Sequence, residues 1–226
     1  MALLLHIDTA TEHASVCISN QKEILAMEKS ADQKNHASFL HEAVKKITSI
    51  AGITLQELDA IAVTAGPGSY TGLRVGLSSA KGLCYALNKP LITVNTLEVM
   101  AYASIQRSSG LPGDKTGCLY CPMIDARRME VFTAVYGSNL ECILKPAAMI
   151  LDENSFGEIL RNNTVIFSGS GAEKLKNIIT HPHAFFSQTE HNAADMLAIS
   201  IHHFEDKSFT NLAYSEPQYL KEFFIK

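Results

Sequence analysis

The sequence predicts an α/β protein in two lobes, and three features of the chain lead to this prediction. Short apolar runs of strand length alternate with helical patterns along most of the 226 residues. The succession of a strand, a glycine-rich turn and a helix occurs in each half of the chain. Residues 108–113, rich in Ser, Gly and Pro, have the composition of a connector. We therefore expect one lobe over residues 1–107 and a smaller lobe over residues 108–226, with a C-terminal tail that can pack back on the first lobe.

The first lobe is predicted to begin with three strands and a helix. Apolar or alternating runs separated by turn residues are typical of an antiparallel meander. In the helix, apolar residues recur at three- and four-residue steps, while Glu42, Lys45 and Lys46 fall on the other face. The expected strands cover residues 3–8, 15–19 and 23–28, and the expected helix covers residues 35–51.

A buried strand, a glycine-rich turn and a second helix follow. Residues 59–65 form a nearly continuous apolar run, which is typical of a strand covered on both faces. Gly and Pro then mark a turn, and a helical pattern begins. The expected turn covers residues 66–70 and the helix covers residues 71–87, followed by a strand at 90–94 and a helix from 95 or 96 to about 106.

The second lobe is predicted to repeat this layout. A turn at Ser168 to Gly171 separates a strand from a helix, as the glycine turn does in the first lobe. Pro217 blocks helix formation in the tail that begins at residue 216. The expected strands cover residues 117–124, 129–136, 140–144 and 165–167, and the expected helices cover residues 172–179 and 193–204.

Composition and charge exclude several classes of function. The chain is 46% hydrophobic and 19% charged, as in ordinary globular proteins rather than disordered or fibrous ones. Its 19 basic and 23 acidic residues give a net charge of −4, so any contact with RNA has to be local or shared with a partner. No apolar run approaches the roughly 20 residues of a membrane span. With no basic region before the first apolar run, we expect a cytoplasmic protein.

The sharpest motif is the strand-to-helix turn that begins at Gly66. Such a turn presents backbone N–H groups at a helix N-terminus, where anions are favourable ligands. However, Gly66, Gly68 and Gly72 are spaced one residue too long for the dinucleotide fingerprint, and no Gly-Lys-Ser/Thr triplet completes a P-loop. A phosphate loop and a tight structural turn therefore both remain open for this motif.

The helix expected at residues 71–87 is apolar around most of its circumference. Gly72, Gly76, Ala80 and Cys84 lie four residues apart and form a ridge of small side chains that we call the small-residue ridge. Such a ridge lets another backbone approach closely. We expect it to contact a partner protein, and the alternative is packing on the protein's own sheet and helices.

The histidine and cysteine patterns do not predict a metal or redox site. None of the nine histidines lies in an H-E-x-x-H motif or an i, i+4 pair. Cys118 and Cys121 fall inside a strand pattern, where residues three apart point to opposite faces, so we expect free thiols. The odd total of five cysteines agrees with reduced thiols.

Arg127 and Arg128 form the densest basic spot of the second half, although a solvated loop would also contain them.

The chain resembles the bacterial TsaB (YeaZ) family of tRNA threonylcarbamoyladenosine biosynthesis proteins, formerly called glycoprotease-like. The resemblance is close over the first hundred residues and thins after about Tyr136. Its most specific part is the string Gly-Pro-Gly-Ser-Tyr-Thr-Gly-Leu-Arg at residues 66–74. The matching stretches are residues 7–11, residues 64–74 with Gly76, residues 95–98 and residues 125–132.

This resemblance implies the actin-like or Hsp70-like ATPase fold, in which two α/β lobes with mixed sheets face each other. In the related catalytic protein TsaD, an H-x-x-x-H motif that binds metal follows the strand after the glycine-rich helix. Thr96 and Met100 stand at those two places here, and neither suits a catalytic iron or zinc ion. The resemblance therefore implies a non-catalytic subunit without cofactor, with ATP or ADP only at an interface shared with TsaD.

The implied partners are the proteins TsaD and TsaE, and the chain would contact tRNA through their complex. The resemblance implies no contact with a membrane. It also implies a homodimer, formed through the helices of the first lobe, as the resting form. The modified base would be the adenosine at position 37 of tRNAs that read codons beginning with A. The expected interface residues are Leu40, Val44, Ile47, Gly72, Leu73, Gly76, Leu77, Ala80, Leu83 and Cys84. The expected vestigial phosphate loops contain Asp8, Thr9, Gly66, Gly68, Ser69 and Thr71.

The alternative is an active enzyme of the same fold. It would be an ATP-binding enzyme of the actin-like group or a glycoprotease-like metallopeptidase of the M22 type. Asp8, which can hold a magnesium-bound nucleotide, and the turn from Gly66 to Gly72 are the features that favour it.

Overall fold

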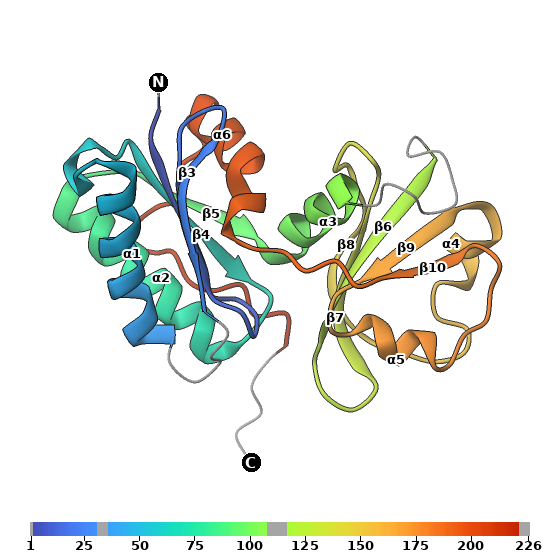
Figure 1. The fold of residues 1–226 in the computed structure, drawn as a ribbon. Helices are drawn as coiled ribbons and strands as arrows, with labels where there is room; N and C mark the ends of the chain where they lie inside the picture. The colour runs from blue at the N-terminus through green and yellow to red at the C-terminus, as the bar shows by residue number, and fades with distance from the viewer. Residues whose placement is uncertain (1, 31–35, 108–116, 222–226) are drawn as a thin grey trace, which may run out of the picture. The chain divides into compact units, whose positions relative to one another are not determined.

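The computed structural model describes residues 2–30, 36–107 and 117–221. The chain divides into two compact units (Figure 1). Unit 1 extends to Thr96 and takes in Asn192–Gln218, whereas unit 2 extends from Leu97 to His191 and resumes at Tyr219. This division differs from the predicted boundary after residue 107, because helix α3 (Thr96–Arg107) clusters with unit 2 and the chain later returns to unit 1. The predicted connector at residues 108–113 lies outside the described residues.

Unit 1 is built on a five-stranded mixed sheet in the order β3-β2-β1-β4-β5. The first three strands form the predicted antiparallel meander, and β4 and β5 continue the sheet parallel to β1. The strands are β1 (Leu4–Asp8), β2 (Ser15–Ser19), β3 (Ile24–Lys29), β4 (Ala60–Gly66) and β5 (Leu91–Asn95).

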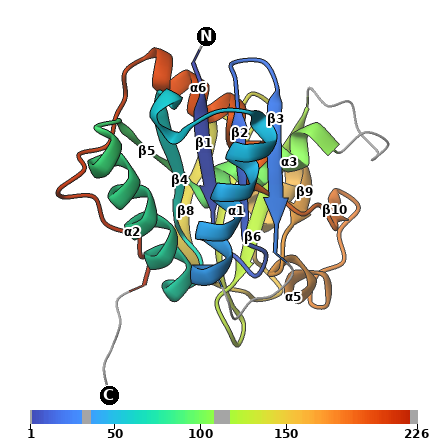
Figure 2. The same cartoon turned by 60° about the vertical axis from the view of Figure 1, so that its left-hand side comes forward.

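Helices cover both faces of this sheet. Figure 2 shows α1 (His36–Ala51) and α2 (Tyr70–Leu87) over one face, where they bury apolar residues of the central strands. The 3-10 helices are η1 (Leu55–Glu57) and η2 (Ala193–Met196), and α6 (Leu197–Glu205) follows η2. On the other face, the Ala193 N–H donates to Ser15 Oγ at 2.9 Å, which fixes the start of η2 on the sheet.

The face under η2 carries polar side chains that are fully buried. His6 Nε2 lies 2.8 Å from Ser19 Oγ, and burial lowers the pKa of His6 to about 3. The imidazole is therefore neutral at physiological pH. Burial and the charges of Asp195 and Asp8 raise the pKa of Cys17 on the same face, so this thiol is protonated.

Unit 2 repeats the strand order of unit 1. Its sheet runs β8-β7-β6-β9-β10, with antiparallel pairing among the first three strands and parallel pairing from β6 to β9 and from β9 to β10. The two α/β units with mixed sheets confirm the predicted fold class. The strands are β6 (Cys118–Asp125), β7 (Glu130–Tyr136), β8 (Cys142–Ile150), β9 (Thr164–Ser168) and β10 (Ala184–Ser187).

The two cysteines of β6 confirm the predicted alternation along this strand. Cys118 packs in an apolar cluster with Leu97 and Met100 of α3, whereas Cys121 packs with Phe167 in the cluster on the other face. Their side chains therefore lie on opposite sides of the sheet, and both are free thiols.

Most long helices agree with their predicted ranges, whereas short elements do not. The segment predicted as a helix at 193–204 forms η2 and α6, and α5 (Ala172–Lys176) ends before the predicted residue 179. No sequence pattern predicted α4 (Gly157–Asn162) or β10, because both are too short for a periodic pattern to develop. Within the described ranges, none of the helices has the length and apolar character that a membrane crossing requires.

Thiol reactivity tests the placement of the five cysteines. Cys142 is exposed, whereas the other four are buried, and burial raises the pKa of Cys84 and of Cys121 to about 12. We expect one rapidly reacting thiol per native chain with a disulfide reagent at about pH 8, and all five after denaturation without reductant. Additional fast thiols in the native protein, or fewer than five after denaturation, would contradict this arrangement.

Candidate functional site

The glycine-rich string at residues 66–74 forms the predicted connection between β4 and α2. Gly66 ends β4 and joins Pro67 through a cis peptide bond. Ser69 is the N-cap of α2, and its hydroxyl accepts a hydrogen bond from the Gly72 N–H at 3.3 Å. The cap therefore gives a hydrogen-bond partner to one of the N–H groups that have none within the helix at this end.

The hairpin between β1 and β2 packs directly against this connection. The Ser69 N–H donates to the Ala10 carbonyl at 2.7 Å, and Thr9 Oγ1 donates to the Gly72 carbonyl at 2.7 Å. A Cβ atom at Gly68 would overlap the Ala10 carbonyl oxygen, and a Cβ atom at Gly72 would overlap that of Thr9. Glycine is required at both positions because two backbones lie in contact there.

Asp8, at the end of β1, is held by hydrogen bonds inside unit 1. Its Oδ1 accepts from Thr64 Oγ1 at 2.9 Å and from the Ala10 N–H at 3.2 Å. Its side chain is fully buried. Both hydrogen bonds tie the carboxylate to β4 and to the β1–β2 hairpin, so Asp8 helps to hold these elements together.

The C-terminal segment covers the other side of the turn. The Gln218 N–H donates to the Ala65 carbonyl at 2.6 Å, and its side-chain Oε1 accepts from Asn95 Nδ2 at 3.1 Å. A Cβ atom at Gly66 would lie only 2.5 Å from the Gln218 carbonyl oxygen. No sequence pattern predicts the role of Gln218, because only tertiary structure brings a residue so distant in sequence to the turn.

The expected phosphate-loop residues therefore gather at one place, with one exception. Asp8, Thr9, Gly66, Gly68 and Ser69 contact one another or the backbone around the turn, as described above. Thr71 instead lies exposed in the first turn of α2. At this turn the Ser69 and Gly72 N–H groups donate to protein oxygens, and protein atoms fill the space beside Gly66, Gly68 and Gly72, which favours the interpretation of this motif as a structural turn.

The two positions that the resemblance aligns with metal ligands carry a hydroxyl group and a thioether. Thr96 is buried at the start of α3, and its hydroxyl has no hydrogen-bond partner among the described residues. Met100, one turn later, packs in the apolar cluster of unit 2. In the part of the chain that the structure describes, no three His, Cys, Asp or Glu side chains gather closely enough to hold a metal ion.

The small-residue ridge lies inside unit 1, which corrects its interpretation as a surface. A Cβ atom at Gly76 would overlap Thr9 Oγ1, so the ridge meets the β1–β2 hairpin. Leu83 is partly buried, and the other nine expected interface residues are buried. Those that pack together in the core of unit 1 are Leu40, Val44, Ile47, Leu77, Ala80 and Cys84. The alternative, packing within the protein, accounts for these side chains.

The exposed surface of α2 lies on the opposite side of the helix. The Arg74 guanidinium stacks on the Tyr70 ring at 4.0 Å from its centroid, and Tyr85 is 84% exposed. Lys81 Nζ donates to the Ser215 carbonyl at 3.0 Å, which brings the 85%-exposed Tyr214 beside the helix. We call this surface the α2 outer face; its residues are Tyr70, Arg74, Ser78, Gly82, Tyr85 and Tyr214.

Comparison with known proteins finds a TsaD family model and relatives named TsaB. The model of "TsaD: tRNA N6-adenosine threonylcarbamoyltransferase" matches residues 17–223. The tRNA threonylcarbamoyladenosine biosynthesis protein TsaB of Buchnera aphidicola is 26% identical over 78% of this chain and 69% of its own length. TsaB of Escherichia coli is 34% identical over 63% of this chain and 62% of its own length, which is less than two thirds.

A solved structure has the same fold. It is a Pseudomonas aeruginosa protein described as similar to the peptidase YEAZ, with a TM-score of 0.85 and 23% identity. The match covers 98% of this chain and 100% of that chain. At this identity the likeness establishes the arrangement of strands and helices in both units.

Replacement of Gly76 by leucine tests the internal position of the small-residue ridge. The branched side chain would meet Thr9, so we expect overpacking to cost about 1–3 kcal/mol and to lower Tm by several degrees. Thermal unfolding measures the change. Gly82→Ala is the control, because a Cβ atom there meets nothing within 4 Å and should leave Tm unchanged or raise it. A Gly76→Leu variant as stable as the parent would refute the internal packing.

Proposed function

Because this chain belongs to the TsaB (YeaZ) family, we propose that it acts in the biosynthesis of N6-threonylcarbamoyladenosine in tRNA. Within this pathway its role is that of a non-catalytic subunit that binds TsaD, with TsaE and tRNA joining the complex. The modified base is the adenosine at position 37 of tRNAs that read codons beginning with A. This role implies a cytoplasmic location.

The main support for a non-catalytic role is that the chain's own backbone fills the space beside the glycine turn. Ala10 approaches Gly68 from one side and Gln218 approaches Gly66 from the other. A phosphate bound at this turn would need the space that these protein atoms fill and the Ser69 N–H that the Ala10 carbonyl uses. ATP or ADP is therefore expected only where the chain and TsaD share an interface.

The competing enzyme function requires Asp8 to contact a magnesium-bound nucleotide. In this structure Oδ1 of Asp8 is committed to Thr64 and to the hairpin, and the residue is fully buried. The peptidase alternative requires metal ligands at positions where Thr96 and Met100 stand. The lack of suitable ligands at these two positions favours a subunit that supports a catalytic partner.

The α2 outer face is the proposed contact surface for TsaD. Exposed aromatic residues and arginine dominate the binding energy at many protein interfaces, and Tyr70, Arg74 and Tyr85 lie together on this face. Gly82 lets a partner helix approach closely, because nothing covers its Cβ position. The residues of the small-residue ridge support this face from beneath. The same face can join two copies of the chain when TsaD is absent.

A Tyr85→Ala substitution tests the contact with TsaD. If Tyr85 anchors the interface, its loss should cost about 2 kcal/mol, which weakens affinity roughly 30-fold. Calorimetric titration of purified TsaD from the same organism measures this change, and Tm of the variant should stay unchanged because the ring is 84% exposed.

Ile150→Ala is the matched control for this experiment. Ile150 is 74% exposed on β8 of unit 2, so its truncation should leave affinity for TsaD unchanged. Equal affinities of the parent and the Tyr85→Ala variant would place the interface elsewhere. Absence of any binding between the parent chain and TsaD would refute the proposed partnership.

Metal and nucleotide analysis tests the non-catalytic role. After purification without chelators, we expect far less than one equivalent of transition metal per chain, because Thr96 and Met100 supply no suitable ligands. The isolated chain should also fail to hydrolyse ATP or peptides. One bound metal ion per chain, or ATP turnover that disappears in an Asp8→Asn variant, would support the enzyme alternative instead.

A further inference from the structure

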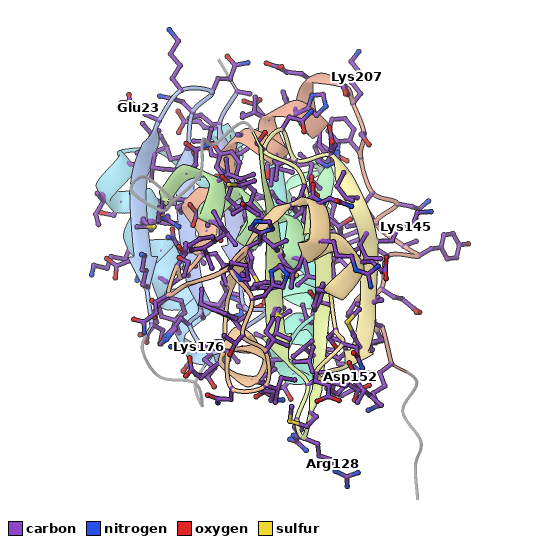
Figure 3. The ribbon with its side chains drawn as sticks, turned by 90° about the vertical axis from the view of Figure 1, so that its right-hand side faces the viewer. Glu23, Arg128, Lys145, Asp152, Lys176 and Lys207 are labelled. Carbon is purple, nitrogen blue, oxygen red and sulfur yellow. The ribbon has the colours of Figure 1, made fainter. Side chains whose placement is uncertain are left out.

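Unit 2 carries two exposed arginines that the proposed contact with TsaD does not use. Arg127 and Arg128 lie in the turn between β6 and β7, followed by the partly exposed Met129. Figure 3 shows the Arg128 side chain extending from the hairpin tip away from the ribbon. Among the described residues, neither guanidinium takes part in a hydrogen bond, an ion pair or a ring contact.

The two acidic residues of the hairpin itself, Asp125 and Glu130, are paired with lysines. Asp125 Oδ1 accepts from Lys174 Nζ at 2.7 Å and from the Arg127 N–H at 2.6 Å. Glu130 forms an ion pair with Lys221. Since the two carboxylates of the hairpin itself pair with lysines, neither of them forms an ion pair with the guanidinium groups at the tip. A compact positive site therefore exists on a chain whose net charge is −4.

The backbone at the tip is unusual for arginine. Arg127 has φ 71° and Arg128 has φ 51°, so two adjacent residues with side chains adopt the left-handed conformation. Glycine and asparagine adopt this conformation at lower cost. Stability of the turn therefore does not explain the arginines, and their guanidinium groups make no internal contact that would explain them either.

The hairpin is anchored firmly behind its tip. The Asp125 N–H donates to Ser170 Oγ at 3.1 Å, and the Gly171 N–H donates to the Met123 carbonyl at 3.0 Å. Lys174 Nζ also donates to the Glu130 carbonyl at 3.0 Å. These bonds join both strands of the hairpin to the turn and helix that follow β9. The backbone of a site held in this way loses little conformational entropy when the site binds a ligand.

We propose that Arg127 and Arg128 bind phosphate groups of the tRNA backbone. Guanidinium groups form paired hydrogen bonds with phosphate oxygens, and two adjacent ones on a projecting tip can reach an RNA strand without a basic surface around them. This inference rests on the proposed function, which brings the chain and a tRNA into one assembly. The contact is to the backbone and therefore positions the RNA without reading its sequence.

The test uses the assembly of the full chain with TsaD and a fluorescently labelled tRNA transcript. The variant carries Arg127→Asn with Arg128→Gly, which removes both charges while supplying residues that favour a left-handed backbone. The control carries Lys145→Gln with Arg161→Gln, which removes two positive charges elsewhere in unit 2. Fluorescence anisotropy gives the affinity between about 50 and 200 mM salt.

We expect the tip variant to bind tRNA about tenfold more weakly at roughly 100 mM salt, with a slope of log affinity against log salt that is shallower by about 2. Its Tm and its affinity for TsaD should match those of the parent, and the control should bind tRNA like the parent. If the Asn-Gly variant unfolds, Arg127→Gln with Arg128→Gln gives the same readout.

Four results would overturn the inference. They are unchanged tRNA affinity in the tip variant, an equal loss in the control, absence of tRNA binding by the parent assembly, and loss of TsaD binding in the tip variant. The last result would assign the arginines to acidic groups of a protein partner. Failure of the parent chain to bind TsaD is a separate result, because it refutes the proposed function before tRNA is added.

Discussion

The close approach of two backbones in unit 1 is the constraint on which the rest of the structure depends. Thr9 and Ala10 of the β1–β2 hairpin lie against Gly68, Gly72 and Gly76, with no space for a side chain between them. This contact sets the position of α2 on the sheet and turns the small-residue ridge inward. As a result, the opposite side of α2, with Tyr70, Arg74 and Tyr85, forms the surface.

Unit 2 uses the same construction with different side chains. There the turn after β9 packs on β6, where a Cβ atom at Gly169 would overlap the Met123 carbonyl oxygen. Gly171 approaches Met123 and Val131 in a similar way. The repeated strand order and the repeated contact between a glycine turn and a hairpin indicate that both units follow one plan. They differ in the residues that the hairpins expose, which are Glu12 and His13 in unit 1 and Arg127 and Arg128 in unit 2.

This difference between the hairpins separates two kinds of surface. In unit 1, the hairpin and Gln218 occupy the space next to the glycine turn, and the α2 outer face carries exposed tyrosines, Arg74 and small residues. Such a surface suits a protein partner. In unit 2, lysines neutralise the carboxylates at the hairpin and leave two arginines in solvent. Such a tip suits a polyanion, so protein and RNA contacts can be carried by separate units of one chain.

The sequence by itself determined the two-unit α/β plan, the antiparallel meander and the opposite faces of Cys118 and Cys121. These properties follow from local periodicity, because side chains alternate along a strand and recur every 3.6 residues along a helix. Only the tertiary structure decided which side of α2 is buried and that Gln218 covers Gly66. A ridge of small residues permits close packing with any backbone, so its pattern does not reveal whether that backbone is the chain's own.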